Sequence, residues 1–400
     1  MPSINDATQT SRSFVSLPFA RRMNYTGSAD MVEIDRARAR MFCANRPGRG
    51  QVGDLQAQGA SMIDIDVTSQ AVSYVTEVQI GNPPTAYTLL IDTGSSNTWV
   101  GANKSYVTSG TTMPTTNLIS LDYGSGSMKG IELLDQVTLA PGLTIENQSI
   151  GVAWVAEGFD GVDGILGIGP TELACGTLFP DIMECVPTVT DNAWSKGLIG
   201  AYEVGISFAP VTEVGQVNGE LTFGGIDPSK YTGTLNYVPI TSSSPANKYV
   251  GIDQSVSYGD VEILSKTAGI VDTGTTLLML SSDAFNTYKN LTGATMDQST
   301  QLLRITREQY SQLKSMYFHI GDSTYEFTPN AQLWPRALNT ELGGTNDGMY
   351  LIVSDLGELS GNGIEFINGM SFLERFYTVY DVENSRVGLA TTRNTYVNSN

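Results

Sequence analysis

The chain has 400 residues and a net charge of −19; 40% of its residues are hydrophobic and only 16% are charged. This length accommodates two domains of ordinary size, and the balance excludes an acidic disordered chain, which would be poorer in apolar residues. No apolar run approaches the roughly 18 residues that cross a bilayer, so we expect a soluble protein without a membrane partner.

The charge is distributed unevenly along the chain. Residues 1–58 hold eight arginines and five acidic residues, a net charge of +3, whereas residues 59–400 hold 14 basic and 36 acidic residues, a net charge of −22. A region as acidic as residues 59–400 repels nucleic acid and anionic lipid, which excludes both as partners. Solubility alone is an equally good explanation of the acidity.

Cysteines and glycosylation triplets bear on the compartment. Cys43 lies in the basic segment, and Cys175 and Cys185 are close enough in sequence to form a disulfide, or they remain free thiols. The Asn-X-Ser/Thr triplets that permit glycosylation on a secretory route begin at Asn24, Asn103, Asn147 and Asn290. The first residues lack the apolar stretch of a signal peptide, so a secreted protein would already have lost its targeting segment.

The chain changes character after its first 58 residues. Residues 29–42 are typical of a short charged helix, and residues 45–59 of an exposed linker. From about residue 62 the pattern is that of a mostly β protein, with stretches rich in Val, Ile, Thr and Tyr bounded by Gly, Asn or Pro. Strands are predicted at 72–81, 85–94, 144–155, 219–225, 234–240 and 386–392, and helices at 281–291, 306–316 and 368–376.

An internal repeat organises this β region. An apolar stretch leads into Asp-Thr-Gly and two hydroxyl residues at Asp92, and again 180 residues later at Asp272. Each copy is followed by an apolar-Gly element, at 163–169 and at 365–372. Matching landmarks predict two similar β lobes related by an approximate two-fold axis, which would bring both Asp-Thr-Gly loops to the junction.

Two facing carboxylates form a catalyst without a nucleophilic side chain or a metal. Like-charge repulsion in a partly desolvated site prevents both from ionising easily, so the pair retains one proton. The ionised carboxylate then removes a proton from a water that attacks a peptide carbonyl, while the protonated one donates to the carbonyl oxygen. We therefore expect Asp92 and Asp272 to be catalytic carboxylates that need neither cofactor nor metal.

The residues after each aspartate support this interpretation. Glycine at positions 94 and 274 lets the backbone approach the carboxylates closely. Thr93 and Thr273 can hydrogen-bond across the junction, and Ser95 and Thr275 can donate to the outer carboxylate oxygens. A single Asp-Thr-Gly is usually a structural turn, but two copies in matching contexts are far more specific.

The chain resembles the pepsin-like aspartic proteases, and most closely their basidiomycete fungal members. The resemblance covers nearly all of residues 60–393 and includes, in the family's order, IDTGSSNTWVGA, LDYGSGSMKG, FDGVDGILGIGP, GELTFGGID, AGIVDTGTTL and EFINGMSFLERFYTVYD. It implies a bilobal β fold with a deep cleft and a β-hairpin flap over it. It divides the chain into a propeptide (1–58), an N-terminal lobe (59–235) and a C-terminal lobe (236–400).

The resemblance also implies roles for individual residues. Asp92 and Asp272 are the dyad, and Tyr123 is the flap tyrosine whose hydroxyl bonds to Trp99, although ordinary packing of two aromatic residues is the alternative. Contacts to the substrate backbone or side chains are implied for Gly94, Ser95, Gly124, Ser125, Ile165, Gly274 and Thr275. Asn368 departs from most relatives, which have an apolar residue in its place.

By the same resemblance, the basic N-terminal segment is an inhibitory propeptide. Arginines remain charged at any relevant pH and hold an acidic body until its carboxylates are protonated. Many relatives place a propeptide lysine against the dyad, but this chain has no lysine before Lys104. An arginine such as Arg46 or Arg49 could take that role, and inhibition by a different route is the alternative. Cleavage is expected between about Arg49 and Ser61.

Other catalytic classes fit poorly. The only histidine is His319, in an alternating stretch typical of a strand, so neither a Ser-His-Asp hydrolase nor a two-histidine zinc peptidase is expected. A catalytically silent peptide-binding relative is the remaining alternative. The prediction is a secreted, monomeric, acid-activated and pepstatin-sensitive endopeptidase that cleaves protein and peptide substrates between apolar or aromatic residues.

Overall fold

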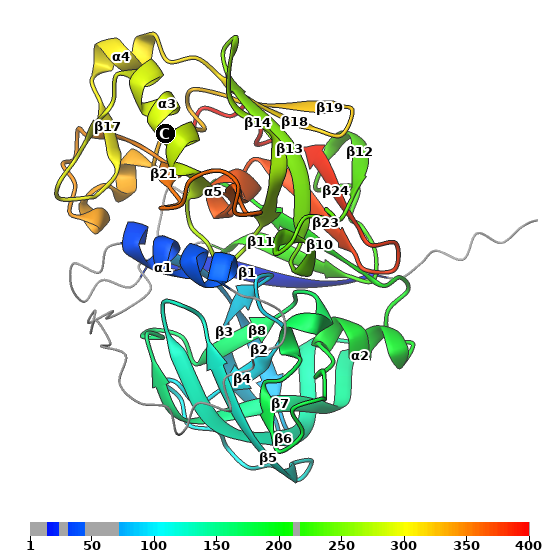
Figure 1. The fold of residues 1–400 in the computed structure, drawn as a ribbon. Coiled ribbons are helices and arrows are strands. Elements are labelled where there is room, and N and C mark those ends of the chain that lie inside the picture. Colours follow the sequence, from blue (N-terminus) through cyan, green and yellow to red (C-terminus); the bar gives the residue numbers. More distant parts are fainter. Residues whose placement is uncertain (1–13, 24–30, 45–71, 211–216, 400) are drawn as a thin grey trace, which may run out of the picture.

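The computed structural model describes residues 14–23, 31–44, 72–210 and 217–399, with the backbone alone at 21–23, 72 and 73. Strands dominate this part of the chain, which confirms the mostly β prediction (Figure 1). The helices are α1 (Met31–Ala44), α2 (Val189–Ser195), α3 (Ser282–Thr292), α4 (Arg307–Ser311) and α5 (Met370–Leu373).

The strands form two lobes and a sheet that joins them. In chain order they are β1 (Val15–Met23), β2 (Val72–Ile80), β3 (Thr85–Asp92), β4 (Thr98–Val100), β5 (Met113–Asp122), β6 (Ser127–Ala140), β7 (Leu143–Glu157), β8 (Gly164–Gly167), β9 (Leu178–Phe179), β10 (Glu203–Phe208), β11 (Val217–Phe223), β12 (Thr232–Pro239), β13 (Gly251–Tyr258), β14 (Val261–Val271), β15 (Leu278–Leu280), β16 (Thr295–Met296), β17 (Leu303–Ile305), β18 (Met316–Ile320), β19 (Ser323–Phe327), β20 (Met349–Leu351), β21 (Val353–Asp355), β22 (Phe366–Asn368), β23 (Phe376–Asp381) and β24 (Arg386–Thr391).

Every stretch predicted as a strand forms one, whereas two of the predicted helices are shorter than expected. The prediction at 281–291 agrees with α3 to within one residue, and that at 29–42 agrees with α1 to within two. The stretch at 306–316 is helical only over α4, because Met316 already begins β18, whose alternate apolar side chains are buried. The stretch at 368–376 is likewise helical only over α5, before β23 begins. The linker predicted at 45–59 lies outside the described residues.

A sheet between the lobes contains a strand from the N-terminal segment. Its strand order is β12-β24-β23-β10-β11-β1-β2, continuing into the lower lobe of Figure 1, so β1 lies between β11 and β2. Leu17 and Phe19 alternate into the core, where the ring of Phe19 packs edge-on against Tyr74 and Phe208. The sequence interpretation had predicted no strand here. Residues 15–23 of the N-terminal segment are therefore a strand of the sheet between the lobes.

The internal repeat corresponds to a repeated topology. β3 pairs in parallel with β8 and places Asp92 beside Gly167; β14 pairs in parallel with β22 and places Val271 beside Asn368. The short strand after each loop, β4 or β15, pairs antiparallel with the same partner, β8 or β22. Each aspartate thus lies at the end of a strand that is paired in the same way, and both aspartates contact α1, which lies between the two lobes in Figure 1.

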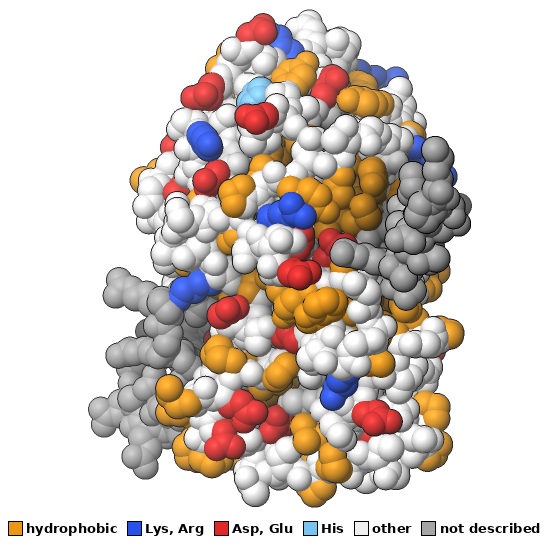
Figure 2. Space-filling view, turned by 90° about the vertical axis from the view of Figure 1, so that its right-hand side faces the viewer, with side chains coloured by type: hydrophobic (Ala, Val, Ile, Leu, Met, Phe, Trp, Pro, Cys, Tyr) orange, Lys and Arg blue, Asp and Glu red, His pale blue; other side chains and the backbone are white. Residues whose placement is uncertain are grey.

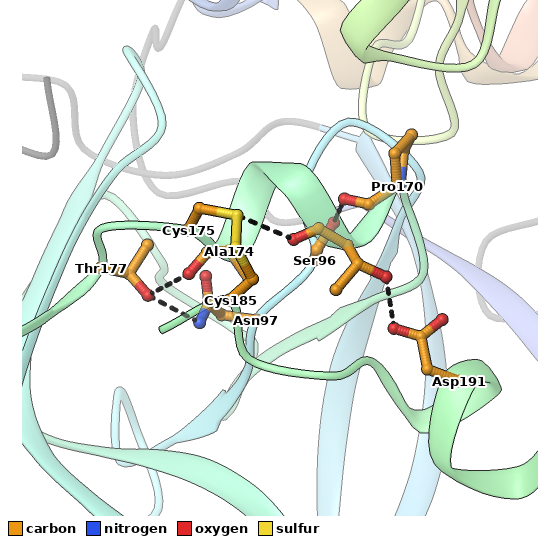
Figure 3. Close-up of a disulfide and its surroundings, with 9 residues drawn as sticks. Ser96, Asn97, Pro170, Ala174, Cys175, Thr177, Cys185 and Asp191 are labelled. Carbon is orange, nitrogen blue, oxygen red and sulfur yellow. Dashed lines mark hydrogen bonds between the residues drawn. A yellow bond between two sulfur atoms is a disulfide. The ribbon is translucent and has the colours of Figure 1, made fainter. Parts of the chain in front are cut away.

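Cys175 and Cys185 are joined by a disulfide that closes a loop of the lower lobe (Figure 3). Nearby, the hydroxyl of Ser96 donates to the carbonyl of Pro170, and the amide of Asn97 donates to Thr177. The disulfide loop is therefore tied to the segment that follows the first Asp-Thr-Gly.

The surface agrees with the acidic composition. The face drawn in Figure 2 carries acidic side chains over both lobes, as a net charge of −19 requires. Across the described ranges, no helix combines the length and apolar character needed to cross a bilayer.

Candidate active site

The two Asp-Thr-Gly loops are locked together by a symmetric set of hydrogen bonds. The backbone N–H of Thr93 donates to the hydroxyl of Thr273 at 2.9 Å, and the N–H of Thr273 donates to the hydroxyl of Thr93 at 3.0 Å. Each hydroxyl in turn donates to a carbonyl of the opposite lobe, Val271 at 3.3 Å and Ile91 at 3.0 Å. Because all these groups are buried, each depends on its partner in the other lobe.

This lock leads to a stability prediction. Thr273→Val removes one hydroxyl and leaves the buried N–H of Thr93 and the carbonyl of Ile91 without their partner. We expect the free energy of unfolding to fall by about 2–3 kcal/mol, measured by urea denaturation at neutral pH. Thr273→Ser keeps the hydroxyl and serves as the control. Equal stability of Val and wild type would show that the lock does not hold the lobes together.

The carboxylates of Asp92 and Asp272 accept equivalent hydrogen bonds from their own loops. Asp92 accepts hydrogen bonds from the backbone of Gly94 at 2.9 Å and the hydroxyl of Ser95 at 2.5 Å. Asp272 accepts from the backbone of Gly274 at 3.2 Å and the hydroxyl of Thr275 at 2.6 Å. The donors therefore come from the residue types that the repeat predicted for this purpose.

Glycine is required on both sides because the loops approach so closely. A Cβ at position 94 would lie 2.7 Å from Oδ1 of Asp272, and a Cβ at position 274 would lie 2.7 Å from Oδ1 of Asp92. Either atom would also collide with the guanidinium of Arg38. Any side chain at these positions would force the carboxylates apart.

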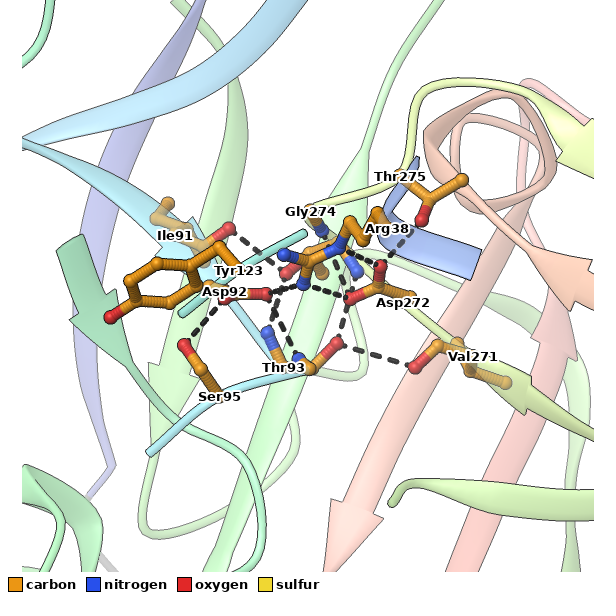
Figure 4. A network of polar contacts seen from close by, with 12 residues as sticks. Arg38, Ile91, Asp92, Thr93, Ser95, Tyr123, Val271, Asp272, Gly274 and Thr275 are labelled. Atoms are coloured by element: carbon orange, nitrogen blue, oxygen red, sulfur yellow. Dashed lines mark hydrogen bonds and ion pairs between the residues drawn. The ribbon is translucent and has the colours of Figure 1, made fainter. Parts of the chain in front are cut away.

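Arg38 of α1 bridges the two carboxylates (Figure 4). Its Nε and Nη2 donate to the two oxygens of Asp272 at 2.7 and 3.0 Å, and Nη2 also donates to Oδ1 of Asp92. The expectation that Arg46 or Arg49 contacts the dyad is corrected, because Arg38 occupies that place. Both alternatives lie outside the described residues, and Arg38 was missed because eight arginines share the segment.

Burial and the guanidinium act differently on the pKa values of the two aspartates. Burial raises the pKa of Asp92 and outweighs Arg38, while the neighbouring charge of Asp272 adds to the rise. Burial also acts to raise the pKa of Asp272, but the charge and hydrogen bonds of Arg38, with the hydroxyl of Thr275, outweigh it and lower that pKa. The stronger bidentate pair with Arg38 therefore stabilises the ionised form of Asp272.

Further contacts hold α1 between the two lobes. The Nε of Arg36 donates to the carbonyl of Asp355 at 3.0 Å. The buried ring of Phe42 packs edge-on against Tyr249 at 4.8 Å and lies against the guanidinium of Arg38 at 4.9 Å. The carboxylate of Asp35 accepts two backbone hydrogen bonds from the loop after Asp272. The sequence interpretation missed Asp35; its only signal was its position one turn before Arg38 on the predicted helix.

The tip of the β5–β6 hairpin, in the N-terminal lobe, also contacts α1. The indole N–H of Trp99 donates to the hydroxyl of Tyr123 at 2.8 Å, the contact that the resemblance implied. Gly124 has a positive φ of 74°, and a Cβ there would lie 2.9 Å from the carbonyl carbon of Ala37, so the hairpin tip contacts α1 directly. Ser125 at the tip is also buried.

Ile165 lies beneath this hairpin. It is buried in an apolar cluster that includes Tyr123, Trp99 and Phe159, with Phe159 edge-on to both aromatic rings. The structure therefore brings Ile165 together with the flap aromatics in one apolar layer beside the dyad.

Asn368, the departure from most relatives, has a specific partner. Its side chain exchanges two hydrogen bonds with the amide of Gln254, at 2.9 and 3.2 Å, and both residues are buried. Its backbone carbonyl accepts from the N–H of Asp272 at 3.2 Å. The polar side chain of Asn368 is thus hydrogen-bonded beneath the second Asp-Thr-Gly loop.

The remaining sequence predictions concern exposed residues and metal ligands. Asn103, Asn147 and Asn290 are exposed, and the amide of Asn103 donates to the carbonyls of Phe159 and Val162; Asn24 lies outside the described residues. His319 is a strand residue, as predicted; its side chain is exposed and hydrogen-bonds to the hydroxyls of Ser257 and Thr324. No cluster of metal-ligating side chains occurs within the described ranges.

Comparisons with known proteins agree with this geometry. The model of the eukaryotic aspartyl protease family matches residues 73–392. The sequence is 56% identical to polyporopepsin of Irpex lacteus over 337 residues, covering 84% of this chain and 99% of that protein. It is 31% identical to pepsin A of Rhinolophus ferrumequinum, covering 80% of this chain and 81% of that protein.

A solved structure gives the same result. The crystal structure of an aspartic proteinase from Irpex lacteus superposes with a TM-score of 0.83 at 49% identity, covering 97% of this chain and all of that one. The bilobal fold, the paired Asp-Thr-Gly loops and these relatives agree: the chain belongs to the eukaryotic aspartyl protease family and is a pepsin-like aspartic endopeptidase.

Proposed function

We propose that the full chain is the proenzyme of a secreted, acid-activated aspartic endopeptidase, with residues 1–58 as its inhibitory propeptide. The bridge from Arg38 to both catalytic carboxylates is the observation that supports this proposal most directly. A substrate carbonyl and an attacking water need the same oxygens that the guanidinium engages. The chain is therefore latent as long as α1 stays in the cleft.

After release of α1, the dyad hydrolyses the peptide bond. Asp92 and Asp272 hold one proton between them, because their mutual repulsion and burial disfavour the doubly ionised pair. One carboxylate accepts a proton from the water that attacks the carbonyl carbon, and the other donates its proton to the carbonyl oxygen, which gives a tetrahedral diol. The diol then returns a proton to the dyad as the C–N bond breaks, and the carboxyl group that took the proton of the water passes it to the leaving amine. Ser95 and Thr275, with the backbone of Gly94 and Gly274, hold the carboxylates in position throughout.

The pKa shift of Asp272 supports release in acid. Because Arg38 lowers this pKa in the docked state, the attraction is fully present above the pKa of the released carboxyl group. It is lost as the pH falls through the lowered pKa of the docked state. Protonation of Asp272 thus weakens the bridge, while Arg38 keeps its charge.

The walls around the dyad favour apolar substrates. The layer of Tyr123, Phe159 and Ile165 lies on one side, and Tyr249, which the ring of Phe42 of α1 contacts, lies on the other. A site that accommodates the ring of Phe42 is suited to apolar or aromatic substrate residues on both sides of the cleaved bond. The monomeric state and secretion proposed from the sequence are part of the same proposal.

The proposal predicts latency at neutral pH and activity after acid exposure. The full chain should show little cleavage of denatured haemoglobin when assayed directly at pH 6, and strong, pepstatin-sensitive cleavage after incubation at about pH 3–4. Mass spectrometry should locate the first cut between Arg49 and Ser61. A matched sample incubated at pH 6 provides the control.

Two outcomes would contradict parts of this proposal. Full activity before acid exposure would show that the N-terminal segment does not inhibit. Absence of activity after removal of residues 1–58 would favour the peptide-binding alternative.

A further inference from the structure

Asp35 is a buried acidic residue of α1 that neither catalysis nor the Arg38 bridge uses. It lies one turn before Arg38, on the same face of the helix. Its Oδ1 accepts from the backbone N–H of Thr276 at 3.1 Å, and its Oδ2 accepts from that of Leu277 at 2.9 Å. Only 1% of the residue is exposed, so its carboxyl group leaves water entirely when α1 docks.

The charges around Asp35 do not balance. Three buried carboxyl groups, those of Asp35, Asp92 and Asp272, share one buried guanidinium, which already bonds to the two catalytic ones. The charged groups that act on Asp35 are Asp272 from the loop after β14 and Arg38 from its own helix. A fully ionised cluster would carry an excess negative charge away from water, which favours retention of a proton.

The pKa of Asp35 is raised to about 7, and burial is the largest cause of the rise. The negative charge of Asp272 also acts to raise this pKa, whereas the two backbone N–H groups and Arg38 act to lower it. In the released helix an aspartate has a pKa of about 3.9. Between these values the docked helix binds a proton that the released helix does not, so docking weakens as the pH rises from about 4 through 7.

We propose that Asp35 is a proton-binding latch that holds α1 in the cleft under mildly acidic conditions and loosens it as the carboxyl group ionises. This inference rests on the proposed function, since it assigns a regulatory step to the inhibitory helix. Protonation therefore has opposite effects at the two residues: at Asp35 it strengthens the docking of α1, whereas at Asp272 it weakens the Arg38 bridge. Docking is therefore strongest at intermediate pH, and acid release is confined to a pH low enough to protonate the dyad.

Hydrogen exchange of the backbone amides of Thr276 and Leu277 in the full-length chain tests this latch. These two N–H groups are protected by Asp35 itself. Corrected for the intrinsic pH dependence of exchange, their protection in the wild type should fall at least about tenfold from pH 5 to pH 8. In Asp35→Asn, which cannot ionise, protection should change less than about threefold over the same range.

The readout is the pH dependence of protection, because Asn also loses one acceptor and lowers protection by a constant factor at every pH. Asp35→Ala removes both acceptors and should also be independent of pH. Glu33→Gln makes the same charge change at a half-exposed position of α1 and should follow the wild type. An equal decline in Asp35→Asn and wild type, or constant protection in the wild type, would overturn the latch.

The test separates this inference from the proposed function. Latency at pH 6 together with constant wild-type protection would reject the latch alone. A tenfold decline in protection together with full activity before acid exposure would reject the inhibitory role while leaving the titration of Asp35 in place.

Discussion

Asp272→Asn is expected to lower kcat by at least about 10³-fold, with the fold intact. Asparagine has nearly the same shape and keeps an oxygen that accepts from the backbone of Gly274. It can neither hold nor transfer the catalytic proton, so the dyad loses half of its acid–base pair. The variant cannot process itself, so its propeptide is removed with immobilised wild-type enzyme, and peptide cleavage is then followed at about pH 3–4.

Asp92→Asn should have the same effect, and the double variant should be little worse than either single one. Two groups that act as one unit lose their joint function once either is removed. Asp322→Asn, at an exposed position between β18 and β19, is the matched control and should keep wild-type kcat. Residual activity within tenfold of wild type in either dyad variant would contradict a mechanism that depends on both carboxylates.

The meeting of the two Asp-Thr-Gly loops could be predicted from the sequence because its information is local and repeated. Each aspartate occurs in a short motif that specifies its strand, its turn and its hydroxyl donor, and the copies at Asp92 and Asp272 reinforce each other. The two-fold relation then requires only that similar sequences fold alike. For the same reason, strands with strong β-branched patterns, such as β3 and β24, were predicted closely.

The contacts of the N-terminal segment depend on tertiary structure and were predicted poorly. Nothing local distinguishes Arg38 from the other arginines; its role depends on the depth at which α1 enters the cleft. β1 was missed because its partner β11 lies about 200 residues away, as the bond from Ser16 to Glu220 illustrates. A short alternation of apolar residues forms a strand only when a neighbouring strand, here β11, offers its edge for pairing.

Arg38→Ala is expected to raise the activity of the unprocessed chain at pH 5.5 by about 10²- to 10³-fold. Removing the guanidinium leaves two buried carboxylates without their shared partner, which disfavours docking of α1 by about 3–5 kcal/mol. The cleft then opens at a pH at which the wild type remains closed. Initial rates on a fluorogenic peptide measure the gain, and mass spectrometry establishes that the chain is still full length.

Arg40→Ala provides the matched control. Arg40 lies on the same helix, but its side chain is 48% exposed and its ion pair with Glu33 is a long one, 4.0 Å from Nη2 to the carboxylate. It removes the same charge from the segment without touching the dyad and should remain latent, since an exposed pair contributes little. Equal activation by both variants would mean that the overall positive charge of the segment maintains latency. Activation by Arg38→Ala alone would assign latency to the bridge, because only that contact distinguishes the two variants.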